Sequence, residues 1–174
     1  MTDEQLSRRL SYLLRHAPDK MNVTLEPGGW APVDAVLRTL RMPRSRLERV
    51  VAADRKGRYT LQGERIRANQ GHSVEVDLRL PLTVPPPLLY HGTHAGVLNA
   101  IRAEGLRPMG RHHVHLSRDE GAARQVGARR GRSVVLRVQA GRMYGAGHPF
   151  YRSENGVWLA EAVPPEFLEF PAGE

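Results

Sequence analysis

Apolar residues near the start of the chain recur at the spacing of an amphipathic helix. The positions concerned are Leu6, Leu10, Leu13 and Leu14. Thr2 and Asp3 are both suitable N-caps for this helix. Pro18 disfavours helical backbone at the residue before it, so the helix should end close to that position. Arg15 and His16 are therefore predicted to lie in its last turn, where a pair of cations can also simply complement the helix dipole.

The pattern that follows predicts two more short helices and a hairpin. Apolar positions at helical spacing lie within Val33–Leu40 and Leu47–Val51, and arginines occupy the polar face of the second of these helices. Two short strand-like runs, Arg58–Leu61 and Arg65–Ala68, are joined by a turn at Gln62–Glu64. Three helices followed by a hairpin is the order of a winged helix, a common nucleic-acid-binding shape.

A polar loop, an alternating segment and a proline-rich stretch come next. The loop Asn69–Ser73 offers many hydrogen-bond donors and acceptors, or is simply a solvent-facing turn. Val74–Leu78 alternates apolar and polar residues, which predicts a strand. The triple proline within Pro81–Pro87 favours a stiff extended chain. We therefore predict a first lobe over residues 1–80, a linker over 81–87 and a second lobe over 88–174.

The second lobe is predicted to contain many short strands. Leu88–Tyr90 is a short apolar run that leads into His91-Gly92-Thr93, and the β-branched run Ser133–Val138 is the clearest strand. An Asn-Gly turn introduces a strand at Val157–Leu159, and Phe167–Phe170 is expected to be an edge strand.

Two helices are predicted between these strands, so the lobe is of the α+β class. The first should end at Gly105, and the second should cover Arg118–Val126. Their inward positions are expected to be Val97, Leu98 and Ile101 in the first and Ala122, Ala123 and Val126 in the second. Gly141–Gly147 is expected to be a loop.

Composition narrows the class of protein. The chain has 174 residues, no cysteine and a formal net charge of +8, so disulfides and thiolate chemistry are excluded. No segment has the roughly 18 apolar residues of a membrane span, and the first residues lack the apolar core of a signal peptide. We expect a soluble, cytoplasmic protein without a membrane partner. A basic surface attracts nucleic acid, although the strong preference for arginine over lysine can also reflect genome base composition.

The densest chemistry lies in Arg111–Ser117, which contains one arginine, three histidines and a serine. Its alternation predicts a short strand with His113 and His115 on one face and His112 on the other. Such a strand can present a cation, an imidazole and a hydroxyl to one ligand. Two simpler interpretations remain open, a metal site and an edge strand with solvated histidines. The first lacks cysteines or a nearby acidic cluster to complete a ligand shell.

Five segments together resemble one enzyme family. In chain order they are Leu10–Pro18, Arg65–Ser73, Tyr90–Thr93, Arg111–Ser117 and Asn155–Leu159. Each is a weak signal alone, but the five in this order closely resemble the RNA 2′-phosphotransferase (tRNA 2′-phosphotransferase) family over nearly the whole chain. The resemblance implies an N-terminal winged-helix RNA-binding lobe and a C-terminal ADP-ribosyltransferase-like, NAD-binding lobe with a split antiparallel sheet.

The activity that the resemblance implies is NAD-dependent removal of an internal 2′-phosphate from RNA, of the tRNA splice-junction type. The RNA 2′-phosphate attacks the nicotinamide ribose C1″ of NAD and expels nicotinamide. The 2″-OH of the ADP-ribosylated RNA then attacks phosphorus, which gives RNA with a 2′-OH and ADP-ribose 1″,2″-cyclic phosphate. The family needs no metal for this reaction, and no obligate protein partner is expected.

The family's essential Arg-His-Arg-Arg tetrad maps onto this sequence as Arg15, His16, Arg58 and Arg111, with Arg67 as the alternative to Arg58. Fixed arginines suit a phosphate dianion because they grip its oxygens with paired donors. A histidine suits proton transfer near neutral pH.

The resemblance also assigns residues to NAD and to RNA. The expected NAD-binding residues are His91, Gly92, Thr93, His115 and Ser117. Possible substrate-binding residues are Arg67, Gln70, His72 and His113. Two alternatives for the whole protein stay open: an ADP-ribosyltransferase that acts on terminal phosphates of RNA or DNA, and a non-catalytic winged-helix nucleic-acid-binding protein.

Overall fold

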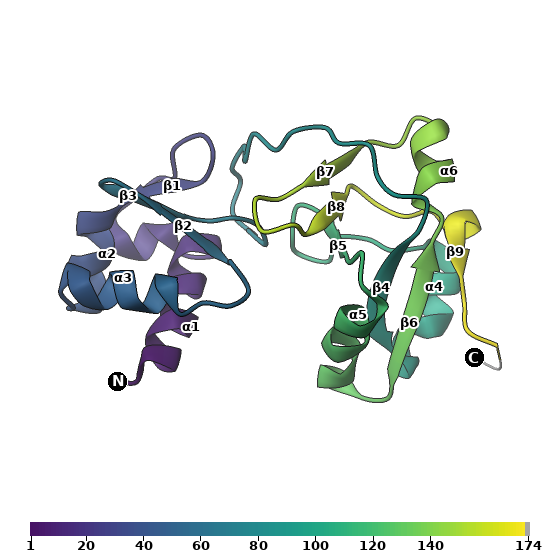
Figure 1. The fold of residues 1–174 in the computed structure, drawn as a ribbon, viewed down its shortest axis with the longest axis horizontal. Coiled ribbons are helices and arrows are strands. Elements are labelled where there is room, and N and C mark those ends of the chain that lie inside the picture. The colour runs from purple at the N-terminus through teal and green to yellow at the C-terminus, as the bar shows by residue number, and fades with distance from the viewer. Residues whose placement is uncertain (173–174) are drawn as a thin grey trace. The chain divides into compact units, whose positions relative to one another are not determined.

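The computed structural model describes residues 1–172, and the chain divides into two compact units (Figure 1). The first unit covers Met1–Leu80 and the second begins at Pro81. Both units combine helices with small antiparallel sheets, as expected for an α+β protein. No helix among the described residues is both long and apolar enough to cross a membrane.

Three helices of the first unit agree with the predicted ones. They are α1 (Asp3–Arg15), α2 (Val33–Leu40) and α3 (Arg44–Ala52), with a short 3-10 turn η1 (Pro18–Met21) after α1. A capping box begins α1, because the Gln5 N–H donates to Thr2 Oγ1 at 3.2 Å and the Thr2 N–H donates to Gln5 Oε1 at 2.8 Å. The predicted apolar face of α1 is buried in the core of this unit.

The predicted hairpin is confirmed, and it belongs to a three-stranded sheet. The hairpin strands are β2 (Tyr59–Gln62) and β3 (Arg65–Ala68), and β1 (Trp30–Pro32) pairs with β3 on its other side, giving the order β1-β3-β2. β1 was not predicted, since it has only three residues and ends in a proline, which cannot donate to a sheet ladder.

The strand predicted at Val74–Leu78 is wrong. The segment keeps an alternating burial pattern, with Leu78 buried and Glu75 and Asp77 exposed, but it pairs with no strand. Its hydrogen bonds go elsewhere: the Val74 N–H to the Arg15 carbonyl at 3.4 Å, and the Asp77 carbonyl from the Gly28 N–H at 2.7 Å. Alternation predicts extended backbone with one buried side, and it does not by itself supply a neighbouring strand.

The second unit contains two three-stranded antiparallel sheets. One has the order β4-β6-β9, from β4 (Leu89–His94), β6 (Ser133–Val138) and β9 (Leu168–Glu169). The other has the order β5-β8-β7, from β5 (Val114–Leu116), β8 (Trp158–Ala160) and β7 (Phe150–Arg152). A single bridge between Tyr90 and Ser117 joins β4 to the end of β5. The expected β4, β6, β8 and edge strand β9 are therefore present.

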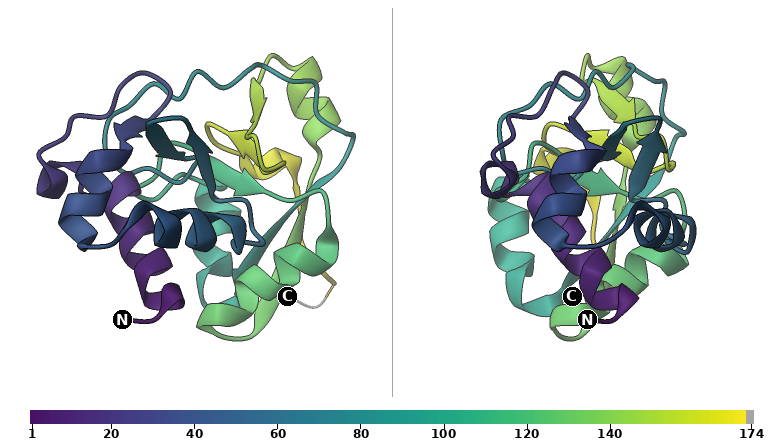
Figure 2. Two further views of the ribbon diagram at one scale, coloured as in Figure 1. Left: turned by 60° about the vertical axis from the view of Figure 1, so that its left-hand side comes forward. Right: turned by 90° about the vertical axis from the view of Figure 1, so that its left-hand side faces the viewer.

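Helix α5 (Glu120–Gly127) packs on the first of these sheets (Figure 2). The closest approach is at a glycine of β4. A Cβ on Gly92 of β4 would lie 1.6 Å from the Ala123 carbonyl oxygen, so only glycine allows this approach. Ala123 faces the sheet as predicted, but Ala122 and Val126 are exposed. The prediction was wrong for Ala122 and Val126 because the helix contacts the sheet through Ala123 and Gly127, one turn apart.

The opposite face of the same sheet belongs to the core of this unit. Leu136 and Val138 of β6 join Leu98 and Ile101 of α4 (Leu98–Glu104) in that core. A short turn η2 (Ala95–Val97) precedes α4, and Gly105 ends it with φ +76°. Turns η3 (Ala128–Arg130) and η4 (Pro165–Phe167) precede β6 and β9.

The loop predicted at Gly141–Gly147 is wrong, and the described part of the second unit, residues 81–172, has three α-helices instead of the two predicted. The additional helix is α6 (Ala140–Gly145). Ala140 and Met143 are fully buried at helical spacing, and this packing outweighs the low helix propensity of the two glycines. One of them, Gly141, lies against the backbone of Pro87, where a Cβ would be 3.2 Å from the Pro87 Cα.

Candidate functional site

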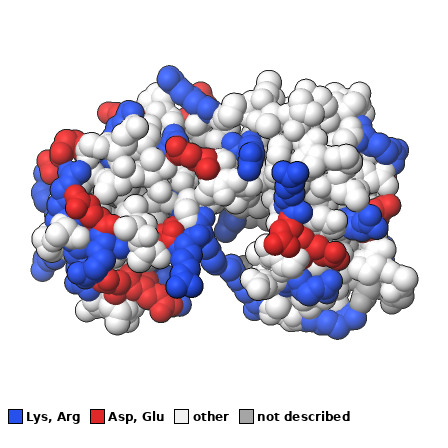
Figure 3. Space-filling model, viewed as in Figure 1, with Lys and Arg blue, Asp and Glu red and all other residues white. Residues whose placement is uncertain are grey.

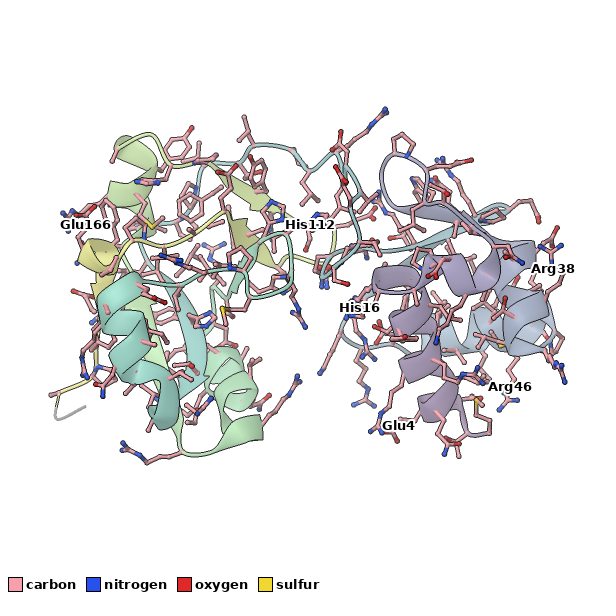
Figure 4. All side chains as sticks on the ribbon, turned by 180° about the vertical axis from the view of Figure 1, so that it is seen from behind. Glu4, His16, Arg38, Arg46, His112 and Glu166 are labelled. Atoms are coloured by element: carbon pink, nitrogen blue, oxygen red, sulfur yellow. The ribbon has the colours of Figure 1, made fainter. Side chains whose placement is uncertain are left out.

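The end of α1 holds the first two predicted catalytic residues. Arg15 is the last helical residue and His16 is the C-cap, whose N–H donates to the Tyr12 carbonyl at 2.9 Å. The His16 Nδ1 lies 2.8 Å from the Ser73 Oγ, and the Ser73 N–H donates to the Arg15 carbonyl at 2.9 Å. Figure 4 shows His16 at the end of α1 opposite Glu4. Ser73 thus fixes the backbone at the helix end and the orientation of the imidazole.

A glycine in the polar loop lies against the Arg15 side chain. Gly71 has φ +89°, and a Cβ there would lie 3.2 Å from Arg15 Nε and 3.3 Å from Arg15 Cζ. On either side of it, Gln70 is 6% exposed and His72 is 1% exposed. The predicted polar loop is therefore a largely buried support behind Arg15, and the solvent-facing alternative does not describe it. His72, a candidate for substrate binding, packs beside Gly29 and Leu78.

Arg58 is held by a buried carboxylate. Asp54 accepts hydrogen bonds from the Arg58 N–H at 2.6 Å and from Arg58 Nε at 3.0 Å. The Asp54 side chain is 3% exposed and that of Arg58 is 30% exposed. An Arg58 amino group also lies 3.5 Å from the Ser7 Oγ on α1. Asp54 therefore orients the Arg58 guanidinium. The contact with Ser7 places this group beside α1, the helix that carries Arg15 and His16.

Arg67, the alternative to Arg58, has different contacts. It pairs with Trp30 across β1 and β3, and its guanidinium lies 4.6 Å from the centre of the Trp30 ring. Its Nη1 also lies 3.4 Å from the Gly28 carbonyl. These contacts hold Arg67 on the turn before β1, whereas those of Arg58 join it to α1. Arg58 therefore stays the better candidate for the third residue of the tetrad.

In the second unit, the His91 ring has a defined protonation state. His91 Nδ1 lies 3.0 Å from the backbone carbonyl oxygen of His115. A carbonyl can only accept, so Nδ1 carries the proton. Burial lowers the pKa of His91, and the bond to this carbonyl offsets only part of the shift. The ring is therefore neutral at pH 7, and its Nε2 has a lone pair that can accept a hydrogen bond from a hydroxyl.

Gly92 and Thr93 follow His91 within β4 rather than beyond its end. Both pair with β6, Gly92 opposite Val135 and Thr93 opposite Val134. Thr93 is 9% exposed, and its backbone lies against Gly127 of α5, where a Cβ would be 2.3 Å from the Thr93 carbonyl oxygen. Gly92 and the backbone of Thr93 therefore also have a packing role, because both lie directly against α5.

Arg111, His115 and Ser117 lie on and around β5. Arg111 Nη1 lies 3.4 Å from His115 Nδ1, and since arginine can only donate, this nitrogen of His115 is the acceptor. The backbone of Ser117 bridges to Tyr90 by two hydrogen bonds of 2.7 and 2.8 Å. Its hydroxyl caps the following turn by accepting from the Asp119 N–H at 3.0 Å. The structure thus brings Arg111, His115 and, through the His115 carbonyl, His91 together.

His113 lies just before β5, against a tyrosine. Its ring centre is 5.3 Å from that of Tyr151, which is on the same sheet face as His115 by register. Burial first, and the nearby His112 second, lower the pKa of His113, while Glu161 acts in the opposite direction. Among residues 1–172, no group of three or more His, Asp or Glu side chains is arranged to hold a metal ion. Figure 4 shows His112 in the loop next to β5.

Three supporting residues were missed as functional candidates. Ser73 orients His16, Gly71 makes room for Arg15, and Asp54 orients Arg58. The spacing of Asp54 and Arg58, four residues apart, is a signal for an ion pair that the sequence did contain. The positive φ of Gly71 and the contact of Ser73 with the end of α1 depend on tertiary structure, so no local pattern announced them.

Comparison with known proteins gives a consistent result over both units. The RNA 2′-phosphotransferase, Tpt1/KptA family matches residues 1–162. A protein of Streptomyces coelicolor named as a probable RNA 2′-phosphotransferase is 53% identical over 173 residues, covering 97% of this chain and 95% of its own. Proteins with the same name from Nostoc punctiforme (48% identical; 97% and 99% covered) and Rhizobium johnstonii (47%; 98% and 96%) are also similar. The chain that carries Arg15, His16, Arg58, His91 and Arg111 in these settings belongs to the RNA 2′-phosphotransferase (Tpt1/KptA) family.

Proposed function

We propose that the protein is an NAD-dependent RNA 2′-phosphotransferase. Its substrate is an RNA with an internal 2′-phosphate, of the kind left at a tRNA splice junction, and its co-substrate is NAD. The observation that carries this proposal is the family match over residues 1–162, which includes every residue to which the resemblance assigns a role. The first unit acts as a winged-helix RNA-binding lobe and the second as an ADP-ribosyltransferase-like lobe.

The arginines bind the phosphate in this proposal. Arg15, Arg58 and Arg111 offer paired N–H donors to its nonbridging oxygens, and their charges stabilise negative charge that moves onto these oxygens. Two of the three have supports that favour such a role, since Gly71 backs Arg15 and Asp54 orients Arg58. Groups that are already oriented need little rearrangement when the substrate binds.

His91 supports NAD binding by its chemistry. A neutral ring with the proton on Nδ1 presents Nε2 as an acceptor, which suits a ribose hydroxyl. Gly92 and Thr93 shape the same strand, while His115 and Ser117 lie on the adjoining one. When bound, NAD supplies an electrophilic ribose carbon, C1″, and a neighbouring 2″-OH.

The proposed reaction has two steps. In the first, a 2′-phosphate oxygen bonds to C1″, the bond from C1″ to nicotinamide breaks, and ADP-ribosylated RNA forms. In the second, the 2″ oxygen bonds to phosphorus and the bond from phosphorus to the RNA 2′ oxygen breaks. The proton of the 2″-OH ends on this 2′ oxygen, and His16, oriented by Ser73, transfers it. The products are RNA with a 2′-OH and ADP-ribose 1″,2″-cyclic phosphate.

The test uses purified protein and a short RNA with one internal 2′-phosphate, with and without NAD, in the presence of EDTA, and mass spectrometry of the products. NAD-dependent loss of one phosphate, together with ADP-ribose cyclic phosphate, is the expected result. The His16→Ala variant should accumulate ADP-ribosylated RNA, because it lacks the group that moves the proton in the second step.

Other results would decide against the proposal. ADP-ribosylated RNA as the end product of the unmodified protein would indicate the ADP-ribosyltransferase alternative. Binding of RNA without any change in RNA or NAD would indicate the non-catalytic alternative. Activity that EDTA abolishes would restore the metal interpretation of His112, His113 and His115.

A further inference from the structure

A solvent-exposed aromatic side chain lies next to Arg15 and His16, the proposed phosphate-binding residues of α1. Tyr12 is on the outer side of α1 and is 47% exposed. It precedes His16 by four residues, so the two side chains share one face of the helix, and their ring centres are 6.2 Å apart at a tilt of 46°. This tilted contact does not cover the Tyr12 ring as a parallel stack would.

Tyr12 lacks the buried hydrogen bond that the other tyrosine of this unit makes. Tyr59 of the same unit is 7% exposed, and its hydroxyl donates to the Ser7 carbonyl at 2.7 Å. No comparable hydrogen bond of the Tyr12 hydroxyl is found within residues 1–172. The core of the unit is built from other side chains of α1. The Tyr12 ring therefore lies outside the core, and a ligand can bind against it without disturbing that core.

A lysine accompanies this ring. Lys20 comes from η1, which follows the turn at Pro18, and its ammonium lies 5.2 Å from the centre of the Tyr12 ring. The contact is a cation–π interaction that restrains both side chains. It places a cation and an exposed aromatic face one helical turn from His16. This pairing of a positive charge with an aromatic surface is the combination by which proteins bind single-stranded nucleic acid.

We propose that Tyr12 and Lys20 form a stacking subsite for one nucleobase of single-stranded RNA, flanking the nucleotide with the 2′-phosphate. The base stacks on the Tyr12 ring, and Lys20 contacts the RNA backbone. This inference rests on the proposed function, because it takes Arg15 and His16 as the residues that meet the phosphate. It adds that the enzyme reads an unpaired neighbour of the modified nucleotide.

The basic face of α3 is already neutralised. The three arginines of α3 all contact carboxylates: Arg44 contacts Glu48 and Glu64, while Arg46 and Arg49 contact Asp3 of α1, at N–O distances of 2.9–3.1 Å. Figure 3 shows positive and negative side chains intermixed over this unit. The third helix, which enters the groove in many winged-helix proteins, is thus poorly suited to bind RNA here. Of these two surfaces, the end of α1 is the better one for RNA.

Base stacking also favours single-stranded RNA over a duplex. A base in a helix already stacks on its neighbours, and sequence-specific contacts to RNA mostly involve unstacked bases. Stacking on an aromatic ring tolerates any base, since each has a π face. The subsite should therefore discriminate unpaired from paired nucleotides, and hardly discriminate among the bases.

The experiment measures the dissociation constant of a fluorescent single-stranded RNA with one internal 2′-phosphate, by anisotropy and without NAD. Two versions of the RNA are compared. One, the natural RNA, has all its bases, and in the other, the abasic RNA, the nucleotides on both sides of the 2′-phosphorylated nucleotide lack their bases. The proteins are the unmodified chain and the variants Tyr12→Ala, Tyr12→Phe and Lys20→Met. Tyr144→Ala is the matched control, because Tyr144 is a similarly exposed tyrosine, at 42%, in the second unit.

Tyr12→Ala should weaken binding of the natural RNA about fivefold to 150-fold, the range for loss of one base–aromatic stack. It should bind natural and abasic RNA equally, whereas the unmodified protein prefers the natural one. Tyr12→Phe and Tyr144→Ala should both behave like the unmodified protein. Lys20→Met should lower the slope of log affinity against log salt by about 0.7, the value for one phosphate contact on a single strand.

Two results would overturn the inference. One is equal affinity of Tyr12→Ala and Tyr144→Ala for the natural RNA. The other is an unmodified protein that does not distinguish abasic from natural RNA. Because binding is measured without NAD, a failure of phosphate transfer would contradict the proposed function and leave the dependence on Tyr12 intact.

Discussion

At the scale of single residues, the candidate site depends on atoms that support the reacting groups. Arg15, His16 and Arg58 each have a neighbour that sets their position, namely Gly71, Ser73 and Asp54. Such supports matter because a displacement of a catalytic group by about 1 Å can cost on the order of a hundredfold in rate.

Gly71→Ala tests one of these supports. The added Cβ would lie 3.2 Å from Arg15 Nε at a backbone φ of +89°, so both the side chain and the loop have to shift. We expect kcat/KM for 2′-phosphate transfer to fall at least tenfold, because Arg15 would be displaced from the phosphate. The melting temperature should fall only slightly. Gly63→Ala is the control, because Gly63 has a similar positive φ but no atom within 4 Å of its Cβ position. Equal activity of the two variants would contradict a role for Gly71 in placing Arg15.

The sequence alone suggested the candidate catalytic residues, and it did not suggest the residues that support them. Arg15 and His16 were found through a motif before Pro18, and Arg111 and His115 through a run of polar residues. A motif shows which residue types occur together. It does not show that Gly71 passes behind Arg15, since this contact joins a loop to a helix far away in the sequence.

At the scale of elements, a cluster of charges ties the start of α1 to α3. Asp3 contacts both Arg46 and Arg49, and Figure 4 shows Arg46 and Glu4 near this end of α1. Hydrogen bonds from Arg49 and then Arg46 lower the pKa of Asp3 below its ordinary value of 3.8. The cluster therefore contributes stability above pH 3.8, and this contribution is lost as the pH falls through the lower pKa of the folded state.

Asp3→Asn should remove this contribution. We expect a modest decrease in melting temperature at pH 7, since exposed ion pairs are screened by water and salt. The difference between the variant and the unmodified protein should shrink at high salt and disappear at pH values well below 3.8. Glu4→Gln is the control, because Glu4 contacts only Arg8 within α1 among the ion pairs of the described residues. A difference that persists in acid would contradict the electrostatic explanation.

The contact between α5 and β4 gives a second prediction at this scale. Gly92→Ala places a Cβ 1.6 Å from the Ala123 carbonyl oxygen, a distance that requires α5 to move away from the sheet. We expect a loss of about 1–3 kcal/mol or more in the free energy of unfolding, as for other overpacked sites. Urea denaturation would measure it, with Gly145→Ala as the control, because a Cβ there meets no atom within 4 Å and Gly145, like Gly92, has no positive φ. An unchanged stability would contradict the packing role of Gly92.

Helices and long strands were predicted better than short or irregular elements. α1, α2 and α3 carry enough periodic apolar positions to define their period, and β6 is a clear β-branched run. β1 has three residues, α6 contains two glycines, and Val74–Leu78 alternates without a partner strand. In these three segments contacts with distant parts of the chain decide the structure. A local sequence pattern does not contain those contacts.

At the scale of the whole molecule, each unit has its own core. The core of the first unit contains no residue beyond Ala68, and that of the second contains none before Leu89. The prediction of two lobes with a proline-rich segment near residue 81 is compatible with the division at Pro81. Because neither core borrows side chains from the other, we expect the units to be separable.

A fragment of residues 1–80 should fold by itself. We expect a helical circular dichroism spectrum and a cooperative melt, although a domain of this size buries a smaller fraction of its surface and should be less stable than the full chain. A non-cooperative melt of the fragment would contradict the independence of the two cores. Leu10→Ala, which removes a fully buried side chain, should abolish the cooperative melt and serve as the unfolded reference.

The bond between His91 and the His115 carbonyl has a consequence for how the activity should respond to acidity. A ring whose proton is fixed on one nitrogen, and whose burial resists a second proton, keeps one charge state through the neutral range. The His91 ring therefore donates and accepts hydrogen bonds, but it does not take up or release protons during the reaction. A pH–rate profile that bends near neutrality should therefore keep its shape when His91 is replaced by Asn or Gln, even if the height of the curve falls.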